Sequence, residues 1–164
     1  MKILVKNLSE GVHEFIEEVP PGAIRLQEPE FYPNTLDLKL YVDRLDNIYR
    51  VKINVKTTAN YICDRCLEGY DSLFDEDGEQ IYQIGPGKLD DDDEVIVLPA
   101  DTKEIDITKA VQDIFVMSRP IKLVCRDSCK GLCVNCGTNL NHKQCQCKSD
   151  DIDPRLEKLK SLLN

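Results

Sequence analysis

The eight cysteines of this 164-residue chain fall into four close pairs, a spacing that is typical of metal binding. In chain order the pairs are Cys63/Cys66, Cys125/Cys129, Cys133/Cys136 and Cys145/Cys147. A structural zinc ion needs four ligands in a tetrahedron, and a tight turn between two cysteines places two sulfurs on one ion. One pair alone would be weak evidence, whereas four pairs predict two structural zinc ions.

The order of the pairs favours one assignment of ligands to the two ions. Cys133, Cys136, Cys145 and Cys147 close a short loop at little cost in chain entropy, so they form predicted site 1. The two earlier pairs then form predicted site 2, which consists of Cys63, Cys66, Cys125 and Cys129. A competing assignment joins the second and third pairs and leaves the fourth pair to reach the first. His142 is an alternative ligand, although eight cysteines leave it no vacant position.

Other thiol chemistry fits the sequence less well. The spacings differ from the cysteine runs of ferredoxins, which argues against an iron–sulfur cluster. A redox dithiol at Cys63/Cys66 would need a helix start in a βαβ unit, but the flanking residues alternate as in antiparallel strands. A four-sulfur site leaves no open position for water, and no phosphate-binding loop or nucleophile elbow occurs. The sequence therefore argues against an enzyme.

Charge is distributed unevenly along the chain. The net charge is −9, and residues 75–94 hold nine acids and one lysine, which predicts a hydrated acidic loop or a patch for a basic partner. Residues 119–148 hold one acid and six bases, which are the candidate contacts to RNA or a partner: Arg119, Lys122, Arg126, Lys130, Lys143 and Lys148. Two zinc–tetrathiolate sites would reduce this local excess from +5 to about +1.

The elements that must position the cysteines follow from hydrophobic periodicity. Residues 36–43 and 49–56 alternate apolar and polar side chains and predict two strands joined by a hairpin at 44–47, with further strands at 69–74 and 79–84. Residues 95–98 are expected to form a short strand or an extended connection. A period near 3.6 predicts a helix over about 106–118, capped by Asp106, and Asp153-Pro154 starts a short final helix. The predicted class is α+β, with one or two helices.

Two regions result from this pattern. Residues 1–118 form a mainly antiparallel β-rich body that includes the acidic loop 75–94, and residues 119–164 form a small cysteine-rich, zinc-binding tail. No charged leader or apolar span is present, which predicts a cytoplasmic protein without membrane contact. A reducing compartment also favours thiol ligands over disulfides.

The cysteine-rich segment resembles a known family. Residues 125–141, which read CRDSCKGLCVNCGTNLN, are similar to the YceD family of large ribosomal RNA subunit accumulation proteins. The resemblance extends to Cys145-Gln146-Cys147, to Asp153-Pro154-Arg155-Leu156 and to Cys63-Asp64-Arg65-Cys66, and it spans roughly residues 35–164. The cysteine-rich tail is similar to that of members from Gram-positive bacteria. Shorter relatives keep the first pair, which implies the two-site pairing above.

The resemblance implies a function and a set of partners. We expect a bacterial, non-enzymatic factor that supports the synthesis, processing or accumulation of 23S ribosomal RNA and large-subunit assembly. Its expected partner is the pre-ribosomal large subunit, through 23S rRNA or a ribosomal protein, with no small-molecule substrate. Two alternatives stay open: a zinc-stabilised protein-interaction module without RNA contact, and a thiol redox protein that uses Cys63/Cys66.

Overall fold

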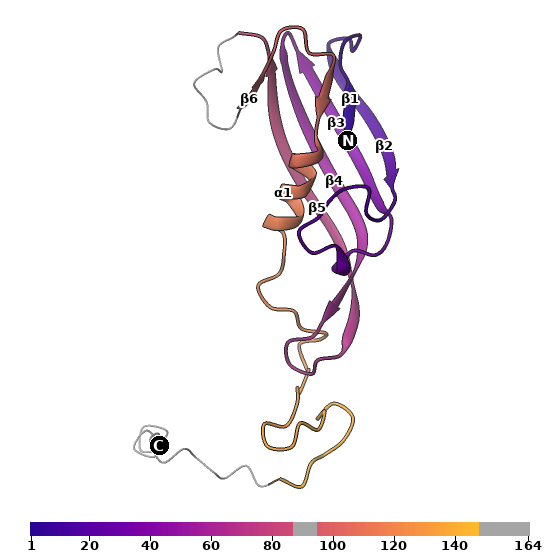
Figure 1. The fold of residues 1–164 in the computed structure, drawn as a ribbon, viewed down its shortest axis with the longest axis vertical. Coiled ribbons are helices and arrows are strands. Elements are labelled where there is room, and N and C mark those ends of the chain that lie inside the picture. Colours follow the sequence, from indigo (N-terminus) through magenta and orange to yellow (C-terminus); the bar gives the residue numbers. More distant parts are fainter. Residues whose placement is uncertain (87–94, 148–164) are drawn as a thin grey trace, which may run out of the picture. The chain divides into compact units, whose positions relative to one another are not determined.

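The computed structural model describes residues 1–86 and 95–147, which form two compact units (Figure 1). The body unit contains Met1–Tyr61 and Gly69–Leu123, and the cysteine unit contains Ile62–Glu68 and Val124–Asn164. The sequence-based boundary at 118/119 left residues 62–68 in the body. The structure assigns them to the cysteine unit, because they carry the first cysteine pair.

The body unit is built on a five-stranded sheet with the order β2-β3-β4-β5-β6. Its strands are β2 (Gly11–Val19), β3 (Leu36–Leu45), β4 (Ile48–Ile62), β5 (Gly69–Ile84) and β6 (Val95–Leu98). The predicted alternation is confirmed along β3 and β4, where the two-residue turn places Asp46 in the left-handed region at φ 55°. The two strands predicted at 69–74 and 79–84 form one continuous strand, β5.

The short connections make the sheet mainly antiparallel. β2 pairs antiparallel with β3, and β3 with β4. Only six residues, 63–68, separate β4 from β5, which is too short for a parallel crossover. The strand predicted at 95–98 is confirmed as β6, which runs parallel to β5 over Ile81–Ile84 in an otherwise mainly antiparallel sheet. Ten residues, 85–94, separate the end of β5 from the start of β6. This length is sufficient for β6 to begin beside Ile81 and to run in the same direction as β5.

Part of the predicted acidic loop is a strand. Asp75, Asp77 and Glu79 lie within β5, so the prediction of a loop over 75–94 is wrong for residues 75–78, and the strand predicted at 79–84 is confirmed. Bases of β4 face these acids: the Lys56 Nζ lies 2.8 Å from Asp75, and the Arg50 Nε lies 3.3 Å from Glu79. This cross-strand pairing offsets the like-charge repulsion that favoured a loop. The rest of the acidic segment, 87–94, lies outside the described residues.

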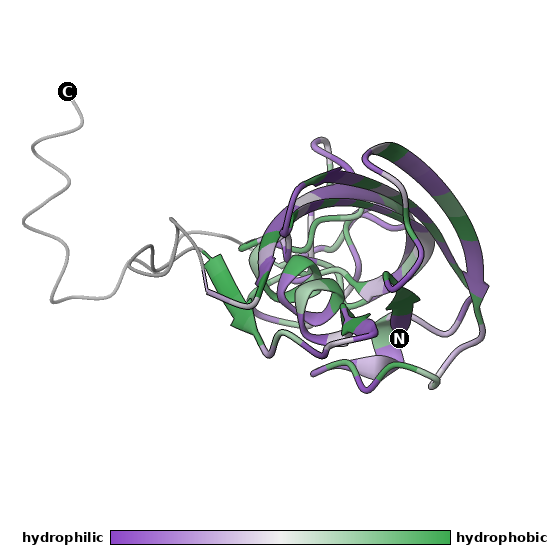
Figure 2. Ribbon diagram, turned by 90° about the horizontal axis from the view of Figure 1, so that it is seen from above, coloured by the Kyte–Doolittle hydropathy of each residue, from purple (hydrophilic) through white to green (hydrophobic). Residues whose placement is uncertain are grey.

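The body core lies between the inner face of the sheet and a layer formed by one helix and a small two-stranded sheet. Figure 2 shows the sheet curving around α1 (Thr108–Met117), while β1 (Lys2–Leu4) pairs with β7 (Glu104–Asp106). The rings of Phe74 and Phe115 stack with their centroids 4.8 Å apart. At Gly78 a Cβ atom would lie 2.5 Å from Ile114 Cγ1, so only glycine allows the helix to approach β5 this closely.

The predicted helix is confirmed with shorter bounds, because α1 begins at Thr108 and ends at Met117. The prediction of Asp106 as the N-cap is wrong, because Ile107 occupies that position; Asp106 lies one residue earlier, where its Oδ1 accepts the Thr108 backbone N–H at 2.9 Å. A short 3-10 helix, η1 (Pro29–Phe31), precedes β3. The short final helix expected after Asp153-Pro154 lies outside the described residues. Among the described residues, no helix has the length and apolar character needed to cross a membrane.

Candidate metal centres

The structure brings together the four cysteines of predicted site 2. Cys63 and Cys66 lie on the loop between β4 and β5, and Cys125 and Cys129 lie at the start of the tail. The Sγ atoms of Cys63 and Cys129 are 3.9 Å apart, and those of Cys66 and Cys125 are 3.8 Å apart. A tetrahedron with a metal–sulfur distance of about 2.3 Å has sulfur–sulfur edges of about 3.8 Å. Site 2 therefore has the dimensions of a tetrathiolate metal site, and all its cysteines except the half-buried Cys125 are buried.

The four cysteines of predicted site 1 also form one group. All four Sγ atoms lie within 4.8 Å of one another, and the Sγ atoms of Cys133 and Cys145 are 3.4 Å apart. Cys136 and Cys147 are exposed, and Cys145 is half-buried. Site 1 is thus the more accessible of the two groups. The competing assignment, which joined the second and third pairs, does not match this grouping.

Both groups contain the same backbone turn, which explains why Cys-x-x-Cys places two sulfurs together. The Leu67 N–H donates to the Cys63 carbonyl at 2.8 Å, and the Gly137 N–H donates to the Cys133 carbonyl at 2.9 Å. The residue after the second cysteine is left-handed in each turn, with φ 58° at Leu67 and 70° at Gly137. Glycine adopts this conformation without strain, whereas leucine does not. The two turns thus form a structural repeat, although one has leucine and the other glycine at the left-handed position.

One side chain links the two groups. Asn141 lies in the site 1 loop, between its two cysteine pairs, yet its Nδ2 donates to the Sγ of the site 2 ligand Cys129 at 3.4 Å. Its Oδ1 accepts the Lys130 backbone N–H at 2.9 Å. A neighbouring contact joins His142 Nε2 to Glu68 Oε1 at 2.6 Å. The loop that holds site 1 is therefore hydrogen-bonded to the segments that hold site 2. Sequence reasoning missed Asn141, because an asparagine in a polar loop carries no distinctive signal.

Local hydrogen bonds make some of these thiols acidic. The Asn141 amide holds the pKa of Cys129 below its ordinary value. The Thr138 hydroxyl, 3.2 Å from the Cys136 sulfur, contributes most to lowering the pKa of Cys136 to about 6. The nearby Cys136 sulfur in turn raises the pKa of Cys147 to about 12. Four thiolates at this spacing repel one another, and a divalent cation removes that repulsion. The donor set and the dimensions therefore fit a metal ion in each group.

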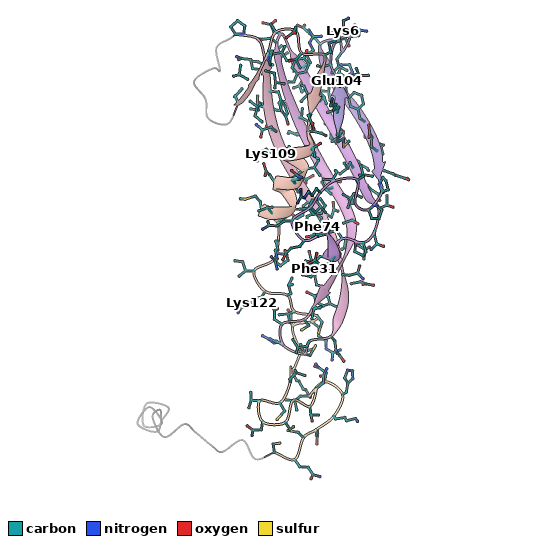
Figure 3. The ribbon with its side chains drawn as sticks, in the orientation of Figure 1. Lys6, Phe31, Phe74, Glu104, Lys109 and Lys122 are labelled. Atoms are coloured by element: carbon teal, nitrogen blue, oxygen red, sulfur yellow. The ribbon has the colours of Figure 1, made fainter. Side chains whose placement is uncertain are left out.

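The six candidate basic contacts are divided between the two units. Arg119 belongs to the body unit, where its Nη1 lies 2.5 Å from Glu28 Oε2 and its guanidinium lies 5.6 Å from the centre of the Phe31 ring. Lys122 is an exposed side chain of the same unit (Figure 3). Three of the candidate bases, Arg126, Lys130 and Lys143, are exposed side chains of the cysteine unit, whereas Lys148 lies outside the described residues. Arg119 is thus engaged with the body.

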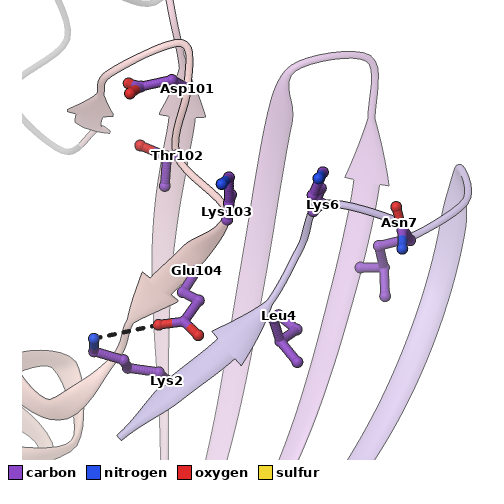
Figure 4. A pocket seen from close by; sticks show the side chains of 9 residues that line it. Lys2, Leu4, Lys6, Asn7, Asp101, Thr102, Lys103 and Glu104 are labelled. Carbon is purple, nitrogen blue, oxygen red and sulfur yellow. Dashed lines mark ion pairs between the residues drawn. The ribbon is translucent and has the colours of Figure 1, made fainter.

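The body unit has a second basic surface that sequence reasoning missed. Lys2, Lys6 and Lys103 line an open depression of about 830 Å³ beside β1 and β7 (Figure 4). Glu104 lies 3.2 Å from Lys2, and Asp101 adds a second acid to the lining. The depression therefore carries a small positive excess. Lys103 is distant in the sequence from Lys2 and Lys6, so no local charge run could have predicted the depression.

Comparison with known proteins identifies the family to which the chain is similar. The model of the large ribosomal RNA subunit accumulation protein YceD family matches residues 51–163. A chloroplastic YCED homolog 1 from Arabidopsis thaliana is 27% identical over 152 residues, which cover 74% of this chain and 47% of that protein. The Zea mays homolog 1 is 38% identical over 87 residues, which cover 49% and 30%. The chain thus spans about half or less of these curated relatives.

No solved structure matches the chain. The family match, however, covers more than half of the chain and includes all eight cysteines. On this ground the chain belongs to the YceD family of large ribosomal RNA subunit accumulation proteins.

Proposed function

We propose that the chain is a non-enzymatic cytoplasmic factor that supports the synthesis, processing or accumulation of 23S ribosomal RNA and the assembly of the large subunit. The family match over residues 51–163 carries this proposal, because the family is named for accumulation of large-subunit ribosomal RNA. The pre-ribosomal large subunit is the proposed partner. Contact is made through 23S rRNA or through a ribosomal protein.

Two structural zinc ions are part of the proposal. Closed tetrathiolate groups with tetrahedral dimensions favour zinc, which then supplies folding free energy to a unit with few apolar residues. We expect about two zinc ions per chain and no reactive thiol under native conditions. One zinc ion together with two reactive thiols at Cys63 and Cys66 would instead support the redox alternative.

Depletion in cells tests the ribosomal role. Loss of the protein should lower the ratio of 23S to 16S rRNA, and the wild-type gene should restore it. A Cys133→Ser variant should restore it poorly and should show a protease-sensitive tail, because site 1 is lost. A 23S level that stays normal after complete depletion would refute the role.

A protein-interaction module without RNA contact is the second candidate, and the charge of the cysteine unit favours it. Its described residues include four Lys or Arg and three Asp or Glu, a net charge of +1. Eight thiolates around two divalent ions would make this net charge about −3. A net negative charge gives such a unit no overall attraction for phosphates. Retention on large-subunit precursors after ribonuclease treatment would favour a protein partner, whereas release by ribonuclease and by high salt would favour RNA.

A further inference from the structure

The strand β2 leaves one edge of the main sheet without a partner in the described part of the chain. It is the first strand in the order β2-β3-β4-β5-β6, and it is nine residues long. Alternate residues of such a strand direct backbone N–H and C=O groups away from the sheet, where another strand can bind them. The opposite edge strand, β6, has only four residues. β2 is therefore the longer template for strand addition.

The acids of β2 differ from those of β5 in their surroundings. Bases on the neighbouring strand β4 compensate the β5 acids through the pairs Lys56–Asp75 and Arg50–Glu79. By contrast, the ion pairs between described residues include none with Glu14, Glu17 or Glu18 of β2. The β2 edge thus carries three acids that form no ion pair among the described residues.

The exposed side chains of β2 also follow a regular pattern. Residues two apart on a strand share a face, so Val12, Glu14, Ile16 and Glu18 form one row of alternating apolar and acidic side chains. Val12 and Ile16 are 68% and 66% exposed. A strand added beside β2 would place apolar side chains opposite Val12 and Ile16, and cations opposite Glu14 and Glu18.

We propose that the free edge of β2 binds an extended, basic segment of a partner protein by adding it to the sheet as a strand. Backbone hydrogen bonds supply affinity in this mode, and the side-chain pattern supplies specificity. The segment alternates apolar residues with Lys or Arg on the face that lies beside Glu14 and Glu18. Nucleic acid fits this edge poorly, because the carboxylates repel its phosphates. A second copy of the chain also fits poorly, since it would bring the three glutamates of each β2 strand close together on adjacent strands.

Two synthetic peptides test the proposal with the full-length chain. The first is a nine-residue peptide that repeats Val-Thr-Lys-Thr, and the second replaces each Lys with Glu. We expect only the basic peptide to bind, as measured by fluorescence anisotropy. Amide hydrogen exchange should slow at alternate residues of Gly11–Val19 when the peptide is bound. Equal binding of both peptides, or unchanged exchange in β2, would overturn the proposal.

A charge-reversal pair separates this edge from a general charge effect. The double variant Glu14→Lys/Glu18→Lys should weaken binding of the basic peptide about tenfold. The matched control Glu30→Lys/Asp101→Lys changes two exposed acids away from β2 and should bind as the wild type does. Circular dichroism confirms that both variants fold. An equal loss of affinity in the control, or preferential binding of a single-stranded RNA oligonucleotide at β2, contradicts the proposal.

Discussion

The hydrogen bonds of Asn141 make a sharp prediction about how the two metal groups depend on each other. Asn141→Ala removes the amide donor that lies 3.4 Å from the Cys129 sulfur. It also removes the acceptor of the Lys130 backbone N–H. The substitution leaves all eight cysteines in place, so any change in metal binding arises from the support of a ligand and not from its loss.

The structure sets the expected size of the effect. Loss of a group that hydrogen-bonds to a metal ligand weakens metal affinity about 10- to 100-fold. The N–H···S contact is long, but the same amide also fixes the Lys130 backbone next to Cys129. We therefore expect about a 30-fold loss of affinity at site 2, in the middle of that range. Site 1 should weaken as well, because Asn141 lies on its loop.

Cobalt is a suitable probe, because Co²⁺ in a tetrathiolate site has strong visible and charge-transfer absorption. Competition between Co²⁺ and a chelator gives the affinity of each site in the wild type and in Asn141→Ala. The matched control is Gln144→Ala, which changes an exposed residue in the same loop. An Asn141→Ala variant with wild-type affinity at both sites, or a Gln144→Ala variant with an equal loss, would refute the coupling.

Two further predictions concern the left-handed turns at Leu67 and Gly137 and the close contact between Gly78 and α1. Leu67 is 65% exposed at φ 58°, so Leu67→Gly should stabilise the cysteine unit by about 1 kcal/mol, and Gly137→Leu should destabilise it similarly. Chelator titrations followed by limited proteolysis measure both effects, and a destabilised Leu67→Gly variant would show that the leucine side chain has a packing role. Gly78→Ala should destabilise the body by about 1–3 kcal/mol, because the new Cβ atom meets Ile114. In chemical denaturation, Gly78→Ala should lower the free energy of unfolding less in an Ile114→Ala background than in the wild type, because the clashing side chain is then absent. Equal losses in the two backgrounds would contradict the steric argument.

The division of charge changes how the acidic composition is understood. The net charge of −9 suggested one acidic loop and one basic tail. In the structure, Asp75 and Glu79 are part of a charge-paired sheet surface, while Glu14, Glu17 and Glu18 of β2 have no ion pair among the described residues. Basic side chains occur both on the cysteine unit and around the depression lined by Lys2, Lys6 and Lys103. Salt dependence of binding is therefore a property of particular surfaces and does not follow from the net charge.

The sequence by itself determined the elements whose residues have a clear period. Alternation along 36–43 and 49–56 predicts β3 and β4, because each strand has one buried and one exposed face. The spacing of Val111, Ile114 and Phe115 predicts α1 for the same kind of reason. Close cysteine pairs also indicate metal binding without any knowledge of the fold, since a two-residue spacer brings two sulfurs together.

Only the tertiary structure decided which pairs meet. Loop closure favoured site 1, but it left a second assignment open, because Cys63 and Cys125 are separated by 61 intervening residues. The connection between β4 and β5 brings the first pair to the start of the tail, where it joins Cys125 and Cys129. Cross-strand bases likewise turned acidic residues 75–79 into part of a strand, which no local charge pattern could show. These features depend on contacts between distant segments, and such contacts form only when the sheet brings those segments together.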